Sequence, residues 1–137
     1  MAYMRDKEIL MYTLKKIRET ILRIISNSEK IDSADYYLLS PAGMERLEST
    51  CMLLLAIGES IKGVDKMTNK KLLCNYPETD WKGAMGIRDI IAHHYFDIDE
   101  SIVYSVVKDK LPGMLKTINR IIEDIKEQNS KCTRQDS

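Results

Sequence analysis

The residues most capable of chemistry lie together in one short segment, Gly86 to Phe96, which reads GIRDIIAHHYF. It contains an arginine, an aspartate, a tyrosine and both histidines of the chain. Histidine exchanges protons near neutral pH, and arginine offers a planar, permanently charged fork that suits phosphate. Without a metal ion, the two suit cleavage of an RNA phosphodiester bond, with histidine moving the proton and arginine stabilising charge. The alternative interpretation is that these residues form a solvated polar surface. The spacing of the residues alone does not decide between this surface and an RNA-cleaving site.

This segment is expected to lie on a short amphipathic helix that begins near residues 78–80. On a helical wheel, where each residue advances by about 100°, His94 falls within the apolar face. The other members of that face are Ala84, Ile87, Ile90 and Ile91. We therefore predict that His94 packs in the core, whereas His93 faces a cleft or a partner.

The remaining polar residues of this helix divide into two sets. Asp89 and His93 are four residues apart, so we expect the Asp89 carboxylate to accept a hydrogen bond from the His93 ring. Arg88 and Tyr95 are seven residues apart and share the other flank. Arg88 and His93 lie about 140° apart on an ideal helix. One phosphate would contact both if Arg88 bends, if the helix distorts, or if two copies face each other, and we favour the symmetric dimer.

The rest of the sequence predicts the helices that position this segment. Apolar residues recur at three- and four-residue steps in each of them, and no segment alternates like a strand. Pro41 suits the first turn of a helix, Gly63 is expected to end that helix, and Pro112 is expected to kink the last one. The expected helices cover residues 4–28, 41–62, about 78–96 and 97–128, with connections at 27–40 and 63–77.

Together these elements predict an all-α, up-and-down bundle of four to five helices. The chain has 137 residues, which is the size of one compact domain. We expect a single helical domain over residues 1–128, followed by a polar and disordered C-terminal tail over residues 129–137. Trp81 is expected to be a core or interface anchor.

Composition narrows the class of protein. The chain carries 21 basic and 21 acidic residues, so its formal net charge is zero, which argues against a general nucleic-acid coat protein. Its three cysteines are far apart, which favours a reducing compartment and gives no metal-binding spacing. We expect no signal peptide, and no apolar run reaches the about 18 residues that a membrane span needs. A cytoplasmic protein that uses no metal is expected.

The motif also resembles a known family. Arg88, four intervening residues, then His93-His94-Tyr95 is similar to the Arg-x4-His-x-Tyr motif of HEPN-domain proteins, and most similar to HepT-like toxins of toxin–antitoxin pairs. The resemblance extends over about residues 5–127. It is carried upstream by Arg46-Leu47 and by Ala56 to Ser60, before the motif by Trp81 to Arg88, and after it by Tyr95 to Asp99.

This resemblance implies a homodimeric helical bundle that cleaves RNA without a metal ion. It implies that Arg88 and His93 are catalytic and that Asp89 supports the site. It also implies that a partner antitoxin, a minimal nucleotidyltransferase, transfers AMP from ATP to Tyr95 and so blocks the RNA cleft. ATP would serve only as that AMP donor, and the chain itself would need no cofactor.

Other residues and other functions stay open on the sequence alone. Glu59 would either face the dimer cleft, as a supporting residue, or be a solvated acid near a helix end. Lys66, Lys70 and Lys71 form the most basic local patch, which would either be solvated or contact a phosphate backbone. The alternatives to a ribonuclease are a non-catalytic HEPN partner, which binds a nucleotidyltransferase or nucleotide, and a plain helical interaction protein.

Overall fold

A computed structural model describes residues 2–94 and 96–135, with side chains described for residues 5–94 and 96–129. Every regular element in these ranges is helical, which confirms the predicted all-α class. The elements in chain order are α1 (Ala2–Asn27), η1 (Ala34–Leu38), α2 (Pro41–Met67), η2 (Leu73–Asn75), α3 (Trp81–His93), α4 (Glu100–Ser105), η3 (Val106–Lys110) and α5 (Leu111–Gln135).

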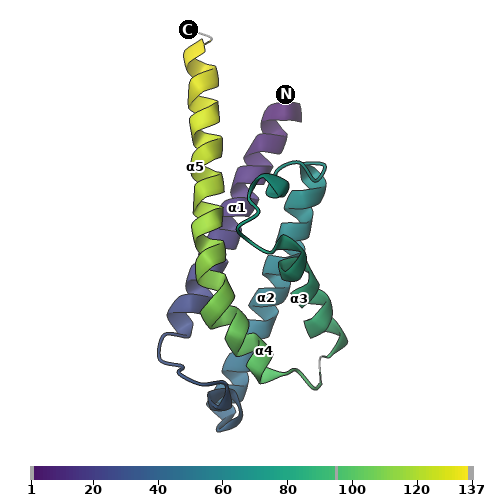
Figure 1. Cartoon of the computed structure of the whole chain (residues 1–137), viewed down its shortest axis with the longest axis vertical. Helices are drawn as coiled ribbons and strands as arrows, with labels where there is room; N and C mark the ends of the chain where they lie inside the picture. Colours follow the sequence, from purple (N-terminus) through teal and green to yellow (C-terminus); the bar gives the residue numbers. More distant parts are fainter. Residues whose placement is uncertain (1, 95, 136–137) are drawn as a thin grey trace.

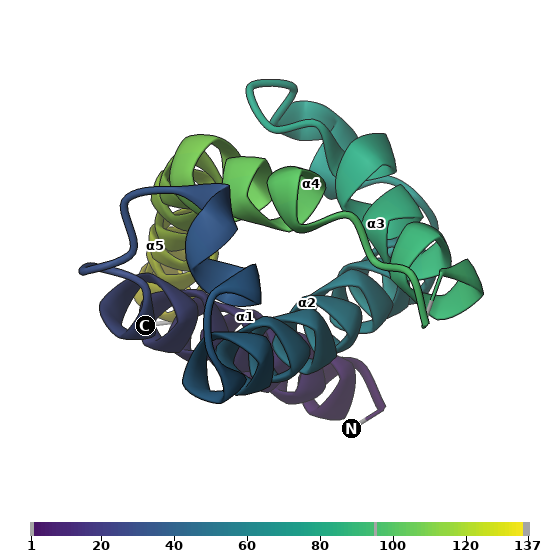
Figure 2. The ribbon, with the colours of Figure 1, turned by 90° about the horizontal axis from the view of Figure 1, so that it is seen from below.

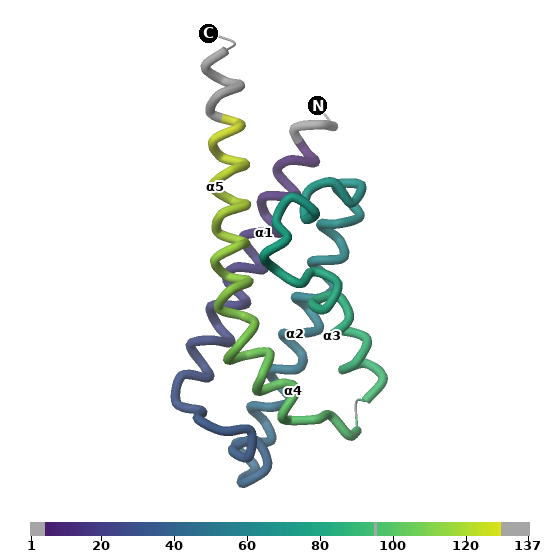
Figure 3. Tube along the Cα trace, in the orientation of Figure 1, coloured from purple at the N-terminus to yellow at the C-terminus, as the bar shows by residue number. Residues whose placement is uncertain are grey.

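The long helices alternate in direction along the length of the molecule (Figure 1). The tube trace shows the chain running down α1, up α2, down α3 and then up through α4 and α5 (Figure 3). Helix α1 packs against both α2 and α5, and α3 packs against α2. In the view from below, α3 lies at the outer side of the bundle, away from α1 (Figure 2). The motif is therefore carried by a peripheral helix whose main support is α2.

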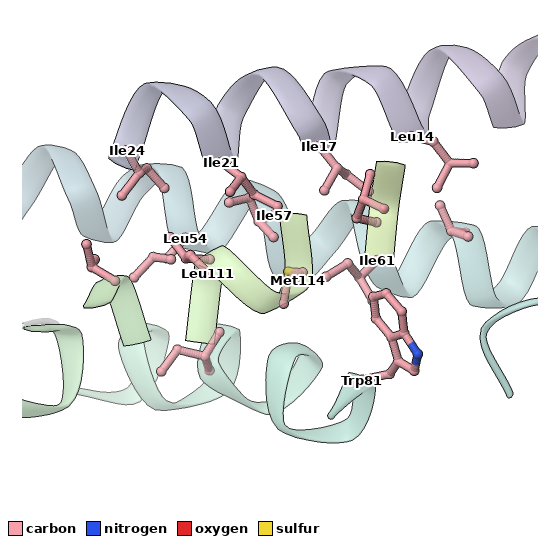
Figure 4. Close-up of a cluster of buried hydrophobic side chains, with 14 of the residues drawn as sticks. Leu14, Ile17, Ile21, Ile24, Leu54, Ile57, Ile61, Trp81, Leu111 and Met114 are labelled. Carbon is pink, nitrogen blue, oxygen red and sulfur yellow. The ribbon is translucent and has the colours of Figure 1, made fainter. Parts of the chain in front are cut away.

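One continuous hydrophobic core joins these helices. Aliphatic side chains of α1 meet those of α2 and α5, with Trp81 of α3 at one end (Figure 4). Burying one such aliphatic side chain contributes about 1.5–3 kcal/mol relative to leaving it exposed. Trp81 is buried, which agrees with its predicted role as an anchor, and Cys51 is buried as well. Burial raises the pKa of the Cys51 thiol to about 11, so it behaves as a small apolar group.

Helix α2 begins where the sequence indicates but ends later. Ser40 caps it by accepting a hydrogen bond from the backbone N–H of Gly43, and Pro41 occupies the first turn. The prediction that Gly63 ends this helix was wrong, because the helix continues to Met67. The turn to a new direction is made instead by Asn69 and Lys70, whose φ angles are 53° and 62°.

The start of α3 is fixed to α5 by a small polar cluster. The Tyr76 hydroxyl donates to Asp124 Oδ2 at 2.7 Å, and the Thr79 hydroxyl donates to Thr117 Oγ1, also at 2.7 Å. The indole N–H of Trp81 donates to the Tyr76 carbonyl at 2.9 Å. Burial and the bond to Asp124 raise the pKa of Tyr76 to about 12, so its hydroxyl keeps its proton. These bonds hold the first turn of α3 while its last turn extends to the surface.

The last helix contains the interruption that Pro112 predicted. Five residues, Val106–Lys110, form a π-helical segment between α4 and α5. The Leu111 N–H donates to the Val106 carbonyl, five residues back, and Pro112 has no N–H to donate. The π segment therefore lies directly before the proline. The Lys108 ammonium donates to the carbonyl of Ser28, the residue that follows α1, at 2.7 Å, which joins the segment to the bundle.

The C-terminal segment differs from the expected disordered tail. Helix α5 continues to Gln135 instead of ending at residue 128, and residues 136 and 137 lie outside the described residues. Within the described chain, no helix is both long and apolar enough to cross a membrane.

Candidate active site

Helix α3 presents the motif along its exposed side and packs its apolar side on the bundle. Asp80 caps its start by accepting a hydrogen bond from the Gly83 N–H at 2.9 Å. Ile87 and Ile91 are buried as the wheel predicts, with Ala84 partly buried against the same core. Ile90, which was expected on that face, is 45% exposed. The buried stripe is therefore narrower than predicted, and more of the helix is accessible.

Arg88 bridges two carboxylates from different helices. Its Nε lies 2.5 Å from Glu59 Oε1 of α2, and its Nη1 lies 3.1 Å from Asp89 Oδ1. The arginine side chain is 40% exposed, so solvent or a ligand can reach it. The structure thus brings Glu59 into the site. A phosphate that binds Arg88 has to compete with both carboxylates for the guanidinium.

Asp89 is held by cations and not by histidine. Its Oδ1 accepts from Arg88 and lies 3.7 Å from Lys62 Nζ, which extends from α2. The Arg88 guanidinium, and then the Lys62 ammonium, hold the pKa of the Asp89 carboxyl below its usual range. Two cations and two carboxylates thus alternate across the α2–α3 contact: Glu59, Arg88, Asp89 and Lys62. Their formal charges cancel, which keeps the resting surface near neutral.

His93 makes a different contact from the one predicted. Its Nδ1 lies 2.7 Å from the backbone carbonyl oxygen of Asp89, one helical turn back. The expected bond to the Asp89 carboxylate is therefore replaced by a bond to the main chain of the same residue. A carbonyl can only accept, so this bond requires the proton on Nδ1. In the neutral ring, Nε2 then carries the free lone pair and is the atom able to take up a proton.

The prediction that His94 packs in the core was wrong. Its side chain is 57% exposed, and its Nδ1 lies 3.7 Å from Asp97 Oδ1. Helix α3 ends at His93, and His94 is its C-cap, with φ −116° and ψ 36°. Because the backbone leaves the helix at this residue, the wheel no longer describes its direction. Tyr95 lies outside the described residues.

Two site residues were missed by sequence reasoning. Lys62 reaches Asp89, and Gly58 lets the two helices approach closely enough for Glu59 to reach Arg88. A Cβ atom at Gly58 would lie 2.9 Å from the Cβ of Arg88 and 3.3 Å from the Ala84 carbonyl oxygen. A signal exists for Lys62, because it lies three positions after Glu59, which places both on one face of α2.

This close approach makes Gly58 sensitive to substitution. We expect Gly58→Val to lower the free energy of unfolding by about 1–3 kcal/mol, because the added side chain meets the Arg88 Cβ and has to displace α3. Denaturant titration followed by circular dichroism measures this loss. The matched control is Gly63→Ala on the same helix, where an added Cβ meets nothing within 4 Å. That change is expected to stabilise by about 0.5–1 kcal/mol. Equal stabilities of the two variants would contradict the close packing.

These features define the class of protein: an all-α HEPN-type bundle with an Arg–His motif on its third long helix. The family model described as Ribonuclease HepT-like matches residues 17–121, and the chain belongs to this family. Among the residues that the structure describes, no group of three His, Cys, Asp or Glu side chains is arranged to hold a metal ion.

Curated relatives from Methanocaldococcus jannaschii are similar over much of the chain. "Putative RNase MJ0127" is 38% identical over 77 residues, which cover 56% of this chain and 60% of that protein. "Putative RNase MJ1216" is 28% identical over 128 residues, 92% of this chain and 97% of that protein. "Putative RNase MJ0125" is 25% identical over 124 residues, 90% and 97% respectively. No solved structure matches the chain significantly.

Proposed function

We propose that this protein is a metal-independent endoribonuclease, the toxin of a toxin–antitoxin pair, which acts in the cytoplasm as a homodimer. The observation that carries the proposal is the hydrogen bond from His93 Nδ1 to the Asp89 carbonyl. That bond leaves Nε2 of an exposed ring available for proton transfer, on the same helix as an arginine. Membership of the ribonuclease HepT-like family supports RNA as the substrate.

In the proposed reaction, RNA supplies its own nucleophile. The ribose 2′-oxygen attacks the adjacent phosphorus, its proton passes to a base, and the bond from phosphorus to the 5′-oxygen breaks. The leaving 5′-oxygen takes up a proton. His93 Nε2 serves one of these transfers, and Arg88 stabilises the charge that builds on the phosphoryl oxygens. The products are a 2′,3′-cyclic phosphate and a 5′-hydroxyl, and no metal or cofactor takes part.

Arg88 has to exchange partners for this chemistry. In the resting structure its guanidinium contacts Glu59 and Asp89. A bound phosphate carries the same charge as those carboxylates and offers the same paired oxygen geometry. Glu59 and Asp89 therefore act as supporting residues that hold the arginine ready at the surface until RNA replaces one of them.

The direct test is RNA cleavage in the presence of EDTA. Purified protein is incubated with a labelled RNA mixture, and product ends are identified by their reactivity with end-specific enzymes. We expect cleavage that EDTA does not inhibit and ends that carry cyclic phosphate. Complete absence of RNA cleavage by the unmodified dimer would contradict the proposed function.

The ion pair between Arg88 and Glu59 also favours a second candidate function. An arginine neutralised by two carboxylates suits a non-catalytic HEPN partner that binds a nucleotidyltransferase, or nucleotide, without cutting RNA. Under this alternative the EDTA experiment gives no products, whereas a complex with the nucleotidyltransferase still forms on gel filtration.

Regulation is proposed to act through Tyr95. Its phenolic oxygen attacks the α-phosphorus of ATP on the antitoxin, pyrophosphate leaves, and the phenolic proton is lost. The attached AMP places bulk and negative charge next to the motif, which excludes RNA.

We expect the intact mass of the protein to rise by one or more AMP units after incubation with a cognate minimal nucleotidyltransferase and ATP. Tyr95→Phe removes only the hydroxyl that accepts AMP, so its mass is expected to stay constant. An unchanged mass of the wild-type chain would contradict this assignment, and so would modification of the phenylalanine variant.

A further inference from the structure

A shallow groove of about 450 Å³ lies between the C-terminal part of α2 and the N-terminal half of α3. We call it the lysine groove, and its lining residues are Lys62, Asp65, Lys66, Asn69, Lys70 and Met85. Three of these are lysines and one is an aspartate, so the lining carries a formal charge of 3 − 1 = +2. The chain as a whole has no net charge. The groove is therefore a local positive excess on a neutral molecule.

The three lysines of the groove follow one another at four-residue steps in the sequence. Lys62 and Lys66 are four residues apart on α2, a rise of about 6 Å along the helix axis. Lys70 continues the four-residue step beyond the helix end. Its backbone is fixed in the left-handed region, with φ 62°, and its N–H donates to the Asp65 carbonyl at 2.8 Å.

The lysine groove is continuous with the candidate active site. Lys62 lines it and also lies 3.7 Å from Asp89 Oδ1, the oxygen that accepts from Arg88 at 3.1 Å. Lys66 and Lys70 form no ion pair with any residue that the structure describes. The end nearest Arg88 is thus neutralised by the site's own carboxylates, while the far end offers unpaired cations.

We propose that the lysine groove is the track that binds the phosphate backbone of the RNA strand flanking the cleaved bond. This inference rests on the proposed ribonuclease function. Arg88 and His93 act at one phosphate, and Lys66 and Lys70 bind phosphates further along the same strand. The substrate is accordingly a single-stranded segment of several nucleotides. A dinucleotide contacts the Arg–His site but does not reach the far lysines.

The experiment compares Lys66→Gln/Lys70→Gln with a matched control, Lys116→Gln/Lys126→Gln, which removes two exposed lysines from α5. The probe is a fluorescent 2′-O-methyl RNA oligonucleotide, which lacks the nucleophilic hydroxyl and therefore cannot be cut. Its dissociation constant is measured as a function of salt concentration. Circular dichroism checks that each variant is folded.

Each lost phosphate contact on a single strand lowers the salt slope by about 0.7, so two lost contacts lower it by about 1.4. At 0.1 M salt this corresponds to about 25-fold weaker binding. We expect that loss for the groove variant and wild-type binding for the control. Cleavage of a dinucleotide by the groove variant is expected to match wild type, whereas cleavage of a long RNA at limiting concentration falls.

The possible failures are distinguishable. If the groove variant binds and cleaves long RNA like wild type, the groove proposal is overturned and the ribonuclease function stands. If the groove variant binds the probe more weakly than wild type, as expected, but wild type cuts no RNA, the groove proposal is supported and the ribonuclease function fails. If wild type does not bind the probe, both are overturned.

Discussion

Replacing His93 with alanine is expected to lower metal-independent RNA cleavage by about 10²–10⁴-fold, the usual contribution of a positioned acid–base residue. The ring is exposed, and its hydrogen bond goes to the Asp89 carbonyl, which already belongs to the α3 backbone. Its removal is therefore expected to leave the fold intact. Initial rates on a fluorogenic RNA in EDTA measure the loss, and the thermal unfolding midpoint shows that stability is unchanged.

The adjacent histidine provides a matched control for this experiment. His94 is exposed as well, but it is the C-cap of α3, and its Nδ1 lies 3.7 Å from Asp97 Oδ1. His94→Ala is expected to keep cleavage within a few-fold of wild type. Equal losses in the two variants would mean that removing either imidazole disturbs the end of α3, and the catalytic assignment of His93 would be wrong.

The second large effect is expected from mixing two inactive variants. Arg88→Ala and His93→Ala are each expected to lose cleavage, but their mixture regains activity if each site takes Arg88 from one protomer and His93 from the other. Random exchange makes half of the dimers mixed, and each mixed dimer has one intact site of two. The recovered rate is then about one quarter of wild type for a two-fold symmetric dimer.

Within one chain, Arg88 and His93 contact different neighbours. Arg88 extends toward α2, where it contacts Glu59, whereas His93 binds the α3 main chain at the end of that helix. The measurement is the cleavage rate after the two variants are denatured and refolded together, compared with each refolded alone. Recovery to a quarter supports a shared site. If the mixture stays as inactive as its components while forming dimers, each site is built within one chain.

Much of the fold was predictable because the apolar residues of its core recur in the sequence with the period of an α-helix. Leu14, Ile17, Ile21 and Ile24 recur at steps of three and four, and all of them are buried. Such a stripe is a sum of many burial energies, each about 1.5–3 kcal/mol, so no single local preference overrides it. The number and order of the long helices follow from these stripes.

Helix ends were harder to predict because weak local preferences decide them. Gly63 costs the helix about 0.5–1 kcal/mol relative to alanine. The burial of Val64, one residue later, offsets that cost, so α2 continues. A second helix end, that of α3, was also predicted wrongly, because the helical wheel assumed that α3 continues through His94. One changed pair of backbone angles at that residue moves its imidazole from the predicted core to solvent.

The site was predictable only in part, for a different reason. The sequence places Arg88, Asp89 and His93 on one helix, but the partners of Asp89 depend on what lies across from it. Lys62 comes from α2, 27 residues earlier, and competes with His93 for the same carboxylate. Arg88 is the first cause of the lowered pKa of Asp89 and Lys62 the second, with His93 last. Local spacing contains no information about that competition.

The π segment at Val106–Lys110 determines where the last helix can lose a residue without disturbing the core. A π turn holds one residue more than an α turn, so a deletion of one residue there converts it to regular α-helix. The helices before and after the deletion keep nearly the same relative rotation. A one-residue deletion further along α5 would instead rotate everything beyond it by about 100°, and Ile118, Ile121 and Ile122 would leave the core. Insertions and deletions in the last helix of relatives are therefore expected to align with this segment.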